Sequence, residues 1–304
     1  MTRVHQLDSE PDERVAEFVE RFQDFGANPT PDKFDKLFEP TGTFWDAGMA
    51  APELYSQAQA VAKAFLRNAS DLWVSVHRWF VRQNWVYLLC DNVGTYHGCP
   101  LSYPAVYACR LHDGLICEAR CYYDQARLVA PLVGGLPLPP VYLPTWTPEL
   151  VDTPALDARE EVDPESFVRR YDALWHLDPA EIPSGLASCY NRDGIILNPG
   201  MIRPITKPEI PGLYETLLTA APDLDPALQG WAGDSDSLCV EWLYRATGRG
   251  GGRGRLDLRV IDVFEFAGGG VQFGHAYYDS LTIAAASNAD IAREISAARE
   301  TALT

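Results

Sequence analysis

Two distant segments of the chain end on the same residues, which indicates that a whole structural unit is repeated. The first ends in Cys-Tyr-Tyr-Asp at residues 121–124 and the second in Ala-Tyr-Tyr-Asp at residues 276–279. A short turn precedes each ending, and strand-like runs precede each turn. These runs cover residues 72–81 and 85–95 in the first half and residues 238–247 and 256–266 in the second. Repetition of this kind predicts a duplicated domain, and 304 residues is a length typical of two domains.

Each half also opens with an amphipathic helix, which leads to a short strand and a further helix. The short strands are expected at residues 43–46 and 194–198, and the further helices at residues 55–67 and 210–220. The opening helices carry apolar residues on one face at helical spacing. These residues are Val15, Phe18, Val19 and Phe22 in the first half and Phe167, Val168, Tyr171 and Leu174 in the second. The order of helices followed by an antiparallel meander predicts an α+β fold for each half.

A proline-rich segment separates the two halves. Six prolines between residues 131 and 148 exclude a helix or a central strand, yet the segment is apolar. Because a free linker would be polar, we expect this one to lie against a domain surface. We predict a first domain over residues 1–129, a docked linker over residues 130–164 and a second domain over residues 165–304. The second domain is expected to end in a helix over residues 288–303.

The chain is strongly acidic, with 42 acidic residues against 25 basic ones and a net charge of −17. Such a surface repels nucleic-acid backbones and anionic membranes, so we expect neither as a partner. The arginines of residues 245–259 flank a glycine run that is typical of a hairpin loop. No apolar stretch is long enough to span a membrane, and acidic residues stand where a signal peptide would have its apolar core. We expect a cytoplasmic protein.

The seven cysteines have neither metal-ligand spacing nor the pattern of a disulfide framework. Most fall in strand-like segments, where reduced thiols serve as small apolar side chains. The histidines are scattered, and the glycine run at residues 248–254 does not connect a strand to a helix as a phosphate-binding loop does. We therefore expect no metal and no cofactor.

One carboxyl group is placed among apolar side chains in the second half. Residues 256–266 alternate with a period of two, so Asp262 shares a face with apolar residues. Burial raises the pKa of such a group, although a buried aspartate can also be purely structural. Its neighbour on the next strand depends on the turn between them. A symmetric loop sets His275 opposite Asp262, whereas a bulged turn faces Ala276 and Tyr278 inward instead.

Corresponding positions in the first half follow from aligning the two turns. Tyr107 then takes the place of Asp262, and Asp46 takes the place of Asn198. Asp46 follows two aromatic residues, a position suited to a base that lines a pocket, although it could instead only cap a turn. A carboxylate base and a neutral phenol donor form a workable pair for removing a proton beside a carbonyl group.

These residues resemble the NTF2-like superfamily, in particular its ketosteroid-isomerase and SnoaL-like polyketide-cyclase branches. The likeness covers residues 12–127 and 165–282 and is sharpest over residues 256–279. It implies two tandem cystatin-like cone domains, each a curved antiparallel sheet wrapped around helices. Because members of the superfamily commonly dimerise, it also implies an intramolecular pseudo-dimer that could form further homo-oligomers.

The resemblance also implies roles for single residues. Asp46 occupies the general-base position of ketosteroid isomerases, and Asp262 that of their protonated, hydrogen-bond-donating aspartic acid. Phe18 falls near the donor tyrosine of that family and cannot donate a hydrogen bond. Asp124 and Asp279 are the nearest matches to the acid/base aspartate of SnoaL-like cyclases.

We predict a cofactor-independent acid/base enzyme that isomerises, cyclises or dehydrates a hydrophobic carbonyl compound such as a polyketide or a steroid-like molecule. The first half is the expected site. The candidate catalytic residues are Asp46, Tyr107 and Asp124 in the first half and Asp262, His275 and Asp279 in the second. The candidate substrate-binding residues are Phe18, Trp45, Trp79 and Tyr123 in the first half and Asn198, Trp242 and Tyr278 in the second.

Two other functions fit the same sequence. Two-domain polyether epoxide hydrolases also look like fused NTF2-like units, and epoxide opening would use Asp46 and Asp124 facing one cavity. A non-catalytic carrier or assembly module is the third interpretation, which Phe18 and Asn198 favour. A carrier should show a closed apolar pocket in which no carboxylate contacts the ligand.

Overall fold

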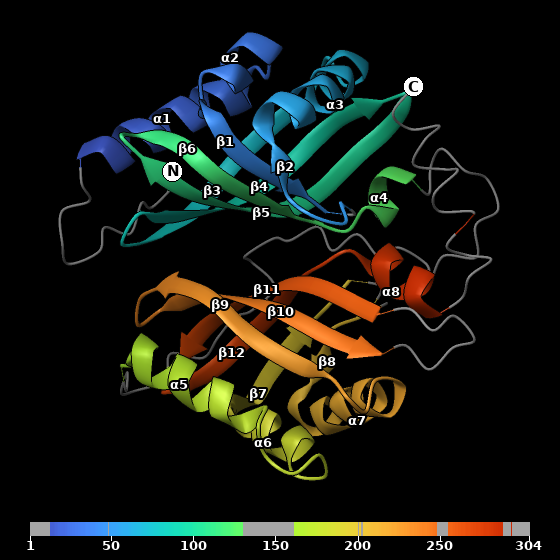
Figure 1. Ribbon diagram of the computed structural model, residues 1–304. Coiled ribbons are helices and arrows are strands. Elements are labelled where there is room, and N and C mark those ends of the chain that lie inside the picture. Colours follow the sequence, from blue (N-terminus) through green and yellow to red (C-terminus); the bar gives the residue numbers. More distant parts are fainter. Residues whose placement is uncertain are drawn as a thin grey trace. The chain divides into compact units, whose positions relative to one another are not determined.

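The computed structural model describes residues 13–47, 49–129, 161–199, 201, 203–247, 255–287 and 293 (Figure 1). The chain folds into two compact units, and contacts group Tyr278–Ala285 with the first unit. Residues 130–160 of the predicted linker, the glycine loop at residues 248–254 and nearly all of the predicted C-terminal helix lie outside the described residues. The predicted domain boundaries therefore stay a prediction.

The first unit is built on one six-stranded sheet with helices packed against it. Its described helices are α1 (Glu13–Ala27), α2 (Pro31–Asp35), α3 (Tyr55–Asn68) and α4 (Ala126–Val129). Its strands are β1 (Phe38–Asp46), β2 (Glu53–Leu54), β3 (Trp73–Arg82), β4 (Trp85–Tyr96), β5 (Cys99–His112) and β6 (Leu115–Tyr122). The strand order is β2-β1-β6-β5-β4-β3, with β1 parallel to β6 and the other neighbours antiparallel.

The second sheet has the same topology as the first. The helices of this half of the chain are α5 (Pro164–Leu174), α6 (Ile182–Ser188), α7 (Ile210–Ala220) and α8 (Ser280–Ser287), with a 3₁₀ turn, η2 (Lys207–Glu209). The strands are β7 (Tyr190–Leu197), β8 (Ile205–Thr206), β9 (Asp225–Gly233), β10 (Ser237–Thr247), β11 (Arg255–Ala267) and β12 (Gly270–Tyr277). Their order is β8-β7-β12-β11-β10-β9, with β7 parallel to β12. The predicted α+β fold, two tandem cones on curved sheets, is confirmed.

The sequence does not predict β9, and this omission shifts both matches of strand-like runs by one strand, so that residues 85–95 correspond to residues 238–247 and not to residues 256–266. β9, and not residues 238–247, corresponds to residues 72–81, because β9 and β3 hold the same edge position in their sheets. β9 contains Pro226 and two glycines, which have low strand propensity and are tolerated at a sheet edge. The alternating apolar pattern that reveals the other long strands is therefore weak in β9.

The repeated turn is a two-residue hairpin in both units. Asp113 and Gly114 connect β5 to β6 with φ of 48° and 76°, and Gly268 and Gly269 connect β11 to β12 with φ of 54° and 81°. Two successive positive φ values are those of a type I′ turn, whose twist suits paired strands. A shift of register follows the turn in each hairpin.

This register shift decides which residue faces Asp262. Phe266 pairs with Val271, as a symmetric loop requires, but beyond the bulge Asp262 lies opposite Ala276. His275 pairs with Val263, so it occupies the other face of the sheet. The alternative in which His275 lies opposite Asp262 is therefore wrong.

The core contains the residues predicted for it. The four apolar residues of α1 are at most 6% exposed, and Phe167, Val168 and Tyr171 of α5 are buried as well, while Leu174 is half-buried. All seven cysteines are free and five are buried, as expected for small apolar side chains. None of the helices in the described part of the chain is long and apolar enough to cross a membrane.

Candidate active site

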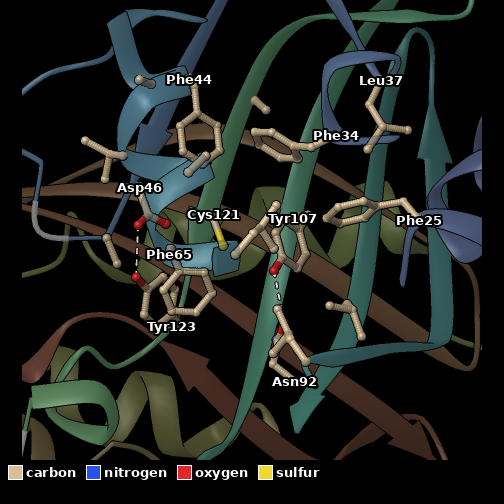
Figure 2. Close-up of a pocket in the computed structure, with 18 of the residues that line it drawn as sticks. Phe25, Phe34, Leu37, Phe44, Asp46, Phe65, Asn92, Tyr107, Cys121 and Tyr123 are labelled. Carbon is tan, nitrogen blue, oxygen red and sulfur yellow. Dashed lines mark hydrogen bonds between the residues drawn. The ribbon is translucent and has the colours of Figure 1, made fainter. Parts of the chain in front are cut away.

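The first unit contains a cavity of about 250 Å³ whose wall is divided by polarity (Figure 2). Helices α1 to α4 contribute apolar side chains, among them Phe25, Phe34 and Phe65. The polar side chains of the wall come from the strands and from the segment after β6. They are Asp46, Asn92, Tyr96, Tyr103, Tyr107, Cys109, Cys121, Tyr123 and Gln125. The strands also contribute apolar side chains, among them Phe44 and Val74. A ligand in this cavity therefore meets hydrogen-bonding groups on the sheet side alone and only hydrocarbon on the helix side.

Asp46 is the last residue of β1 and directs its carboxyl group into this cavity. The hydroxyl of Tyr123 donates a hydrogen bond to its Oδ2 at 2.9 Å. Burial raises the pKa of Asp46 to about 7, although the hydrogen bonds from Tyr123 and Cys121 act in the opposite direction. Loss of hydration thus outweighs these contacts, and near neutral pH both protonation states of Asp46 are accessible.

Tyr107 lines the same cavity from β5. Its hydroxyl donates to Oδ1 of Asn92 at 3.1 Å, and its ring packs against Phe22 with centroids 5.2 Å apart. Burial raises the pKa of Tyr107 well above its usual value, so its phenol keeps its proton. Tyr107 is therefore a neutral hydrogen-bond donor at any physiological pH.

Cys121 lies between these two groups (Figure 2). It is the residue of β6 that pairs with both Asp46 on β1 and Tyr107 on β5. Burial raises the pKa of the Cys121 thiol well above its usual value, so it is a neutral group and not a nucleophile. A base and a neutral donor thus face one cavity from either side of one small side chain.

Three predicted pocket residues of the first half do not line the cavity. Phe18 is fully buried and packs against Phe22 in the core. Trp45 precedes Asp46 and so points to the other face of the sheet, where its ring packs on Tyr122 and its Nε1 donates to the Met49 carbonyl. Trp79 lies on β3 outside the cavity wall. Tyr123 is the predicted aromatic residue that does line it.

Asp124 and Asp279 precede helices α4 and α8 and lie outside the cavity wall. The Oδ1 of Asp124 accepts hydrogen bonds from the Ala126 amide at 3.2 Å and from the Ser280 amide and hydroxyl at 3.1 and 2.8 Å. Asp279 accepts from the Leu281 amide and the Thr282 hydroxyl at the start of α8. The repeated Tyr-Tyr-Asp ending is thus a strand end followed by a helix-starting aspartate.

Substitutions at Asp124 separate this structural role from an acid/base role. Asp124→Asn keeps an Oδ1 acceptor, so we expect nearly wild-type stability and activity, whereas Asp124→Ala should lose about 1 kcal/mol of stability. Urea unfolding and turnover measurements on both variants check this. Loss of activity in a stable Asp124→Asn protein would instead assign Asp124 to the chemistry.

The second unit buries Asp262 in an aromatic surrounding. Burial raises the pKa of Asp262 to about 7. Tyr171 and Tyr190 lie close enough to interact electrostatically with its carboxyl group, and both phenols have pKa values raised by burial. The predicted inward placement of Asp262 is therefore confirmed.

The other residues predicted for the second half take different positions. Trp242 is fully buried, and Tyr278 is half-buried beyond the end of β12. The backbone N–H of Asn198 donates to the Met201 sulfur at 3.2 Å, and the backbone N–H of Asp46 donates in the same way to the Met49 sulfur at 3.3 Å. This shared contact supports the alignment of Asn198 with Asp46.

The strand registers explain why the two interiors differ. Leu88 lies opposite Tyr107, and Val240 lies opposite Asp262, so these pairs correspond. Counting along the strands from these pairs matches Cys90, Asn92 and Cys109 with Trp242, Tyr244 and Phe264, respectively. The second unit therefore places three aromatic side chains, each at most 8% exposed, where the first has two cysteines and an asparagine. Two of these rings, Tyr244 and Phe264, stand where the first unit has Asn92 and Cys109, which line its cavity.

Sequence reasoning missed Asn92, Cys121 and the phenylalanines of α2 and α3. Cys121 could have been predicted from the alignment of the strands, because it is the common neighbour of Asp46 and Tyr107. Asn92 follows the apolar run of residues 85–90 and stands beside Asp91 in β4, so nothing in the sequence indicates that its side chain is the buried one. Phe34 lies in a helix of five residues that carries too little pattern to assign a face.

No family model and no curated protein match this chain. Within the described residues, no group of three or more metal-ligating side chains could hold a metal ion.

Several solved structures resemble parts of the chain at low identity. A protein with a ketosteroid isomerase-like fold from Catenulispora acidiphila, solved with trimethylamine, is 18% identical with a TM-score of 0.35, over 38% of this chain and 92% of that one. An NTF2-like protein from Anabaena variabilis is 16% identical with a TM-score of 0.34, over 38% and 93%. An LEH-like epoxide hydrolase from M. tuberculosis is 15% identical with a TM-score of 0.33, over 38% and 85%. This is likeness of fold alone.

Proposed function

We propose that the first unit, an NTF2-like cone by its topology, is the catalytic half of a cofactor-independent acid/base enzyme acting on a hydrophobic carbonyl compound. The observation that carries this proposal is Asp46, whose carboxyl group lines an apolar cavity and has a pKa raised to about 7. A general base is most effective when its pKa lies near the working pH. This proposal has the reaction class predicted from the sequence, and it places the reaction in the cavity of the first unit.

The first step is removal of a proton from the carbon beside the carbonyl group. The Asp46 carboxylate takes this proton, and the electron pair of the C–H bond moves to form an enolate. Tyr107 turns its hydroxyl from Asn92 to the carbonyl oxygen, where negative charge develops, and stabilises it with a hydrogen bond. Return of the proton to another carbon gives isomerisation, and attack of the enolate on a second carbonyl group gives cyclisation.

The carboxyl group in the cavity distinguishes this function from that of a carrier. A carrier gains nothing from a carboxyl group whose ionisation is costly, because an unpaired charge in an apolar pocket lowers stability. The polar groups of the wall would also weaken the binding of a purely apolar ligand. Asp46, Tyr107 and Tyr123 together favour a ligand that has a reactive polar group.

Epoxide opening by Asp46 and Asp124 is not favoured by the geometry. That reaction needs both carboxyl groups at one cavity, and Asp124 is absent from the wall. Its Oδ1 already accepts three hydrogen bonds from Ala126 and Ser280. We therefore do not propose it.

Exchange of the protons beside a carbonyl group with solvent tests the proposal before the natural substrate is identified. In deuterium oxide the protein should accelerate loss of the corresponding proton signals of 2-indanone, a two-ring ketone with activated C–H bonds, by at least about 10²-fold over buffer. Proton NMR follows the exchange directly. A rate equal to that of buffer for a panel of one- and two-ring ketones would contradict the proposal.

The exchange rate should rise with pH and level off above about 7, because burial raises the pKa of Asp46 to about 7 and only its ionised form accepts a proton. Tyr123→Phe removes a hydrogen bond that lowers this pKa, so the inflection should move to higher pH. Tyr122→Phe, on the opposite face against Trp45, is the matched control and should leave the inflection in place. A flat profile from about pH 5 to pH 9 would count against Asp46 as the base.

A further inference from the structure

We propose, on the premise of the proposed function, that the substrate is a carbonyl compound of one or two rings, with about ten non-hydrogen atoms, and not a four-ring, steroid-like molecule. This narrows the substrate class expected from the sequence. The inference rests on the volume of the cavity, on the placement of its polar groups and on the residues that limit its size.

The volume of the cavity sets how much of a ligand it can enclose. An engineered apolar cavity of roughly 150 Å³ holds one benzene ring. At the same packing density, the cavity of about 250 Å³ holds about ten non-hydrogen atoms. A single ring with a short side chain, or two fused rings, fills this space. Four fused rings contain roughly twice as many atoms and require a pocket in the range of drug-sized ligands, about 300–1,000 Å³.

The polarity of the wall sets the layout of the ligand. Polar side chains lie on the sheet side of the cavity, where Asp46, Cys121 and Tyr107 follow one another (Figure 2). The helix side is apolar, and its Phe34 meets Phe44 of β1 edge to face, with ring centroids 6.2 Å apart. A polar group on the helix side of a bound ligand would lose its hydration without gaining a partner. The substrate therefore has one polar edge, which carries the carbonyl group, and an apolar body.

Two wall residues, Cys109 and Phe65, allow substitutions that change the size of the cavity in opposite directions. Cys109 lines it from β5, and the corresponding residue of the second unit is Phe264, whose ring is 1% exposed. A phenylalanine at position 109 should therefore fill space that the ligand uses. Phe65 lines the cavity from α3 and packs against Tyr96, with ring centroids 5.0 Å apart. Removing its ring should enlarge the space by about the volume of a benzene ring.

Calorimetric binding to the full-length Asp46→Asn protein tests this inference, because binding is then measured without turnover. 2-Indanone should bind saturably, and the four-ring ketone androstenedione should not. Adding Cys109→Phe should weaken 2-indanone binding at least about tenfold, whereas Cys99→Phe, on the same strand outside the cavity wall, should not. Adding Phe65→Ala should strengthen binding of the three-ring ketone anthrone at least about tenfold. The two changes alter the cavity in opposite directions, so failure of one variant to fold leaves the other informative.

The inference and the proposed function fail in different ways. Androstenedione binding as tightly as 2-indanone would overturn the size limit, as would absence of binding by every one- and two-ring ketone in the panel. Saturable binding of 2-indanone to a wild-type protein that does not accelerate its proton exchange would uphold the size limit and reject the proposed chemistry. Catalysed exchange of the androstenedione protons would uphold the proposed chemistry and overturn the size limit.

Discussion

Replacing Asp46 with asparagine is expected to slow the exchange of protons beside the carbonyl group by about 10²- to 10⁴-fold, the usual contribution of a general base. Asparagine has the same shape and can still accept the hydrogen bond from Tyr123, but it cannot accept the substrate proton. Stability should not fall, because burial raises the pKa of Asp46 and its charge is therefore costly in the folded state. Proton NMR in deuterium oxide measures the rate, and urea unfolding measures the stability.

Asp262→Asn is the matched control for this experiment. Asp262 is also a buried aspartate with a pKa raised to about 7, but it lies in the second unit, away from the cavity wall. Its replacement should leave the exchange rate within about twofold of wild type. Equal losses in the two variants, or no loss in Asp46→Asn, would contradict the assignment of the base to the first unit.

The same Asp262→Asn substitution is expected to stabilise the protein above neutral pH, by as much as about 4 kcal/mol. Burial raises the pKa of Asp262 from 3.8 to about 7, so between these values the folded state holds a proton that the unfolded state has lost. The folded protein therefore loses stability as pH rises through this window and carries the full penalty above about 7. Asparagine has no charge at any pH and avoids the penalty.

Urea unfolding of wild-type and Asp262→Asn protein at about pH 5 and about pH 8 measures this effect. The variant should gain less than half as much stability at the lower pH as at the higher pH, because at about pH 5 the unfolded state has lost the proton and the penalty has reached only part of its full size. An equal gain at both pH values would show that the change acts through packing and not through ionisation.

Much of the fold was predictable because the repeat and the alternation of apolar residues are strong local signals. The expected helix over residues 210–220 agrees with α7, and residues 256–266 lie within β11. The common ending of the two halves aligned Asp46 with Asn198 and Tyr107 with Asp262. The structure supports both matches through the strand registers.

Other features depend on contacts that the local pattern does not contain. Trp45 and Asp46 are neighbours in sequence and point to opposite faces of the sheet. The pairing of β1 with β6 sets Asp46 beside Cys121, on the face that lines the cavity. The bulge beside Phe266 moves His275 to the other face. Asp124 looks like a catalytic acid until its three hydrogen bonds are known. Whether a cone is hollow depends on side-chain volumes spread over several strands, which no single segment reveals.

The most direct test of this account is an NMR titration of the aspartate carboxyl carbons, with and without 2-indanone. Two signals should titrate near pH 7, and Asp46→Asn and Asp262→Asn should each remove one of them. Because Asp46 lines the cavity, we predict that the ligand shifts the titration of the Asp46 signal and leaves that of Asp262 unchanged. An Asp46 signal that titrates near 3.8, the value of an unperturbed aspartate, or that does not respond to the ligand, would contradict the account.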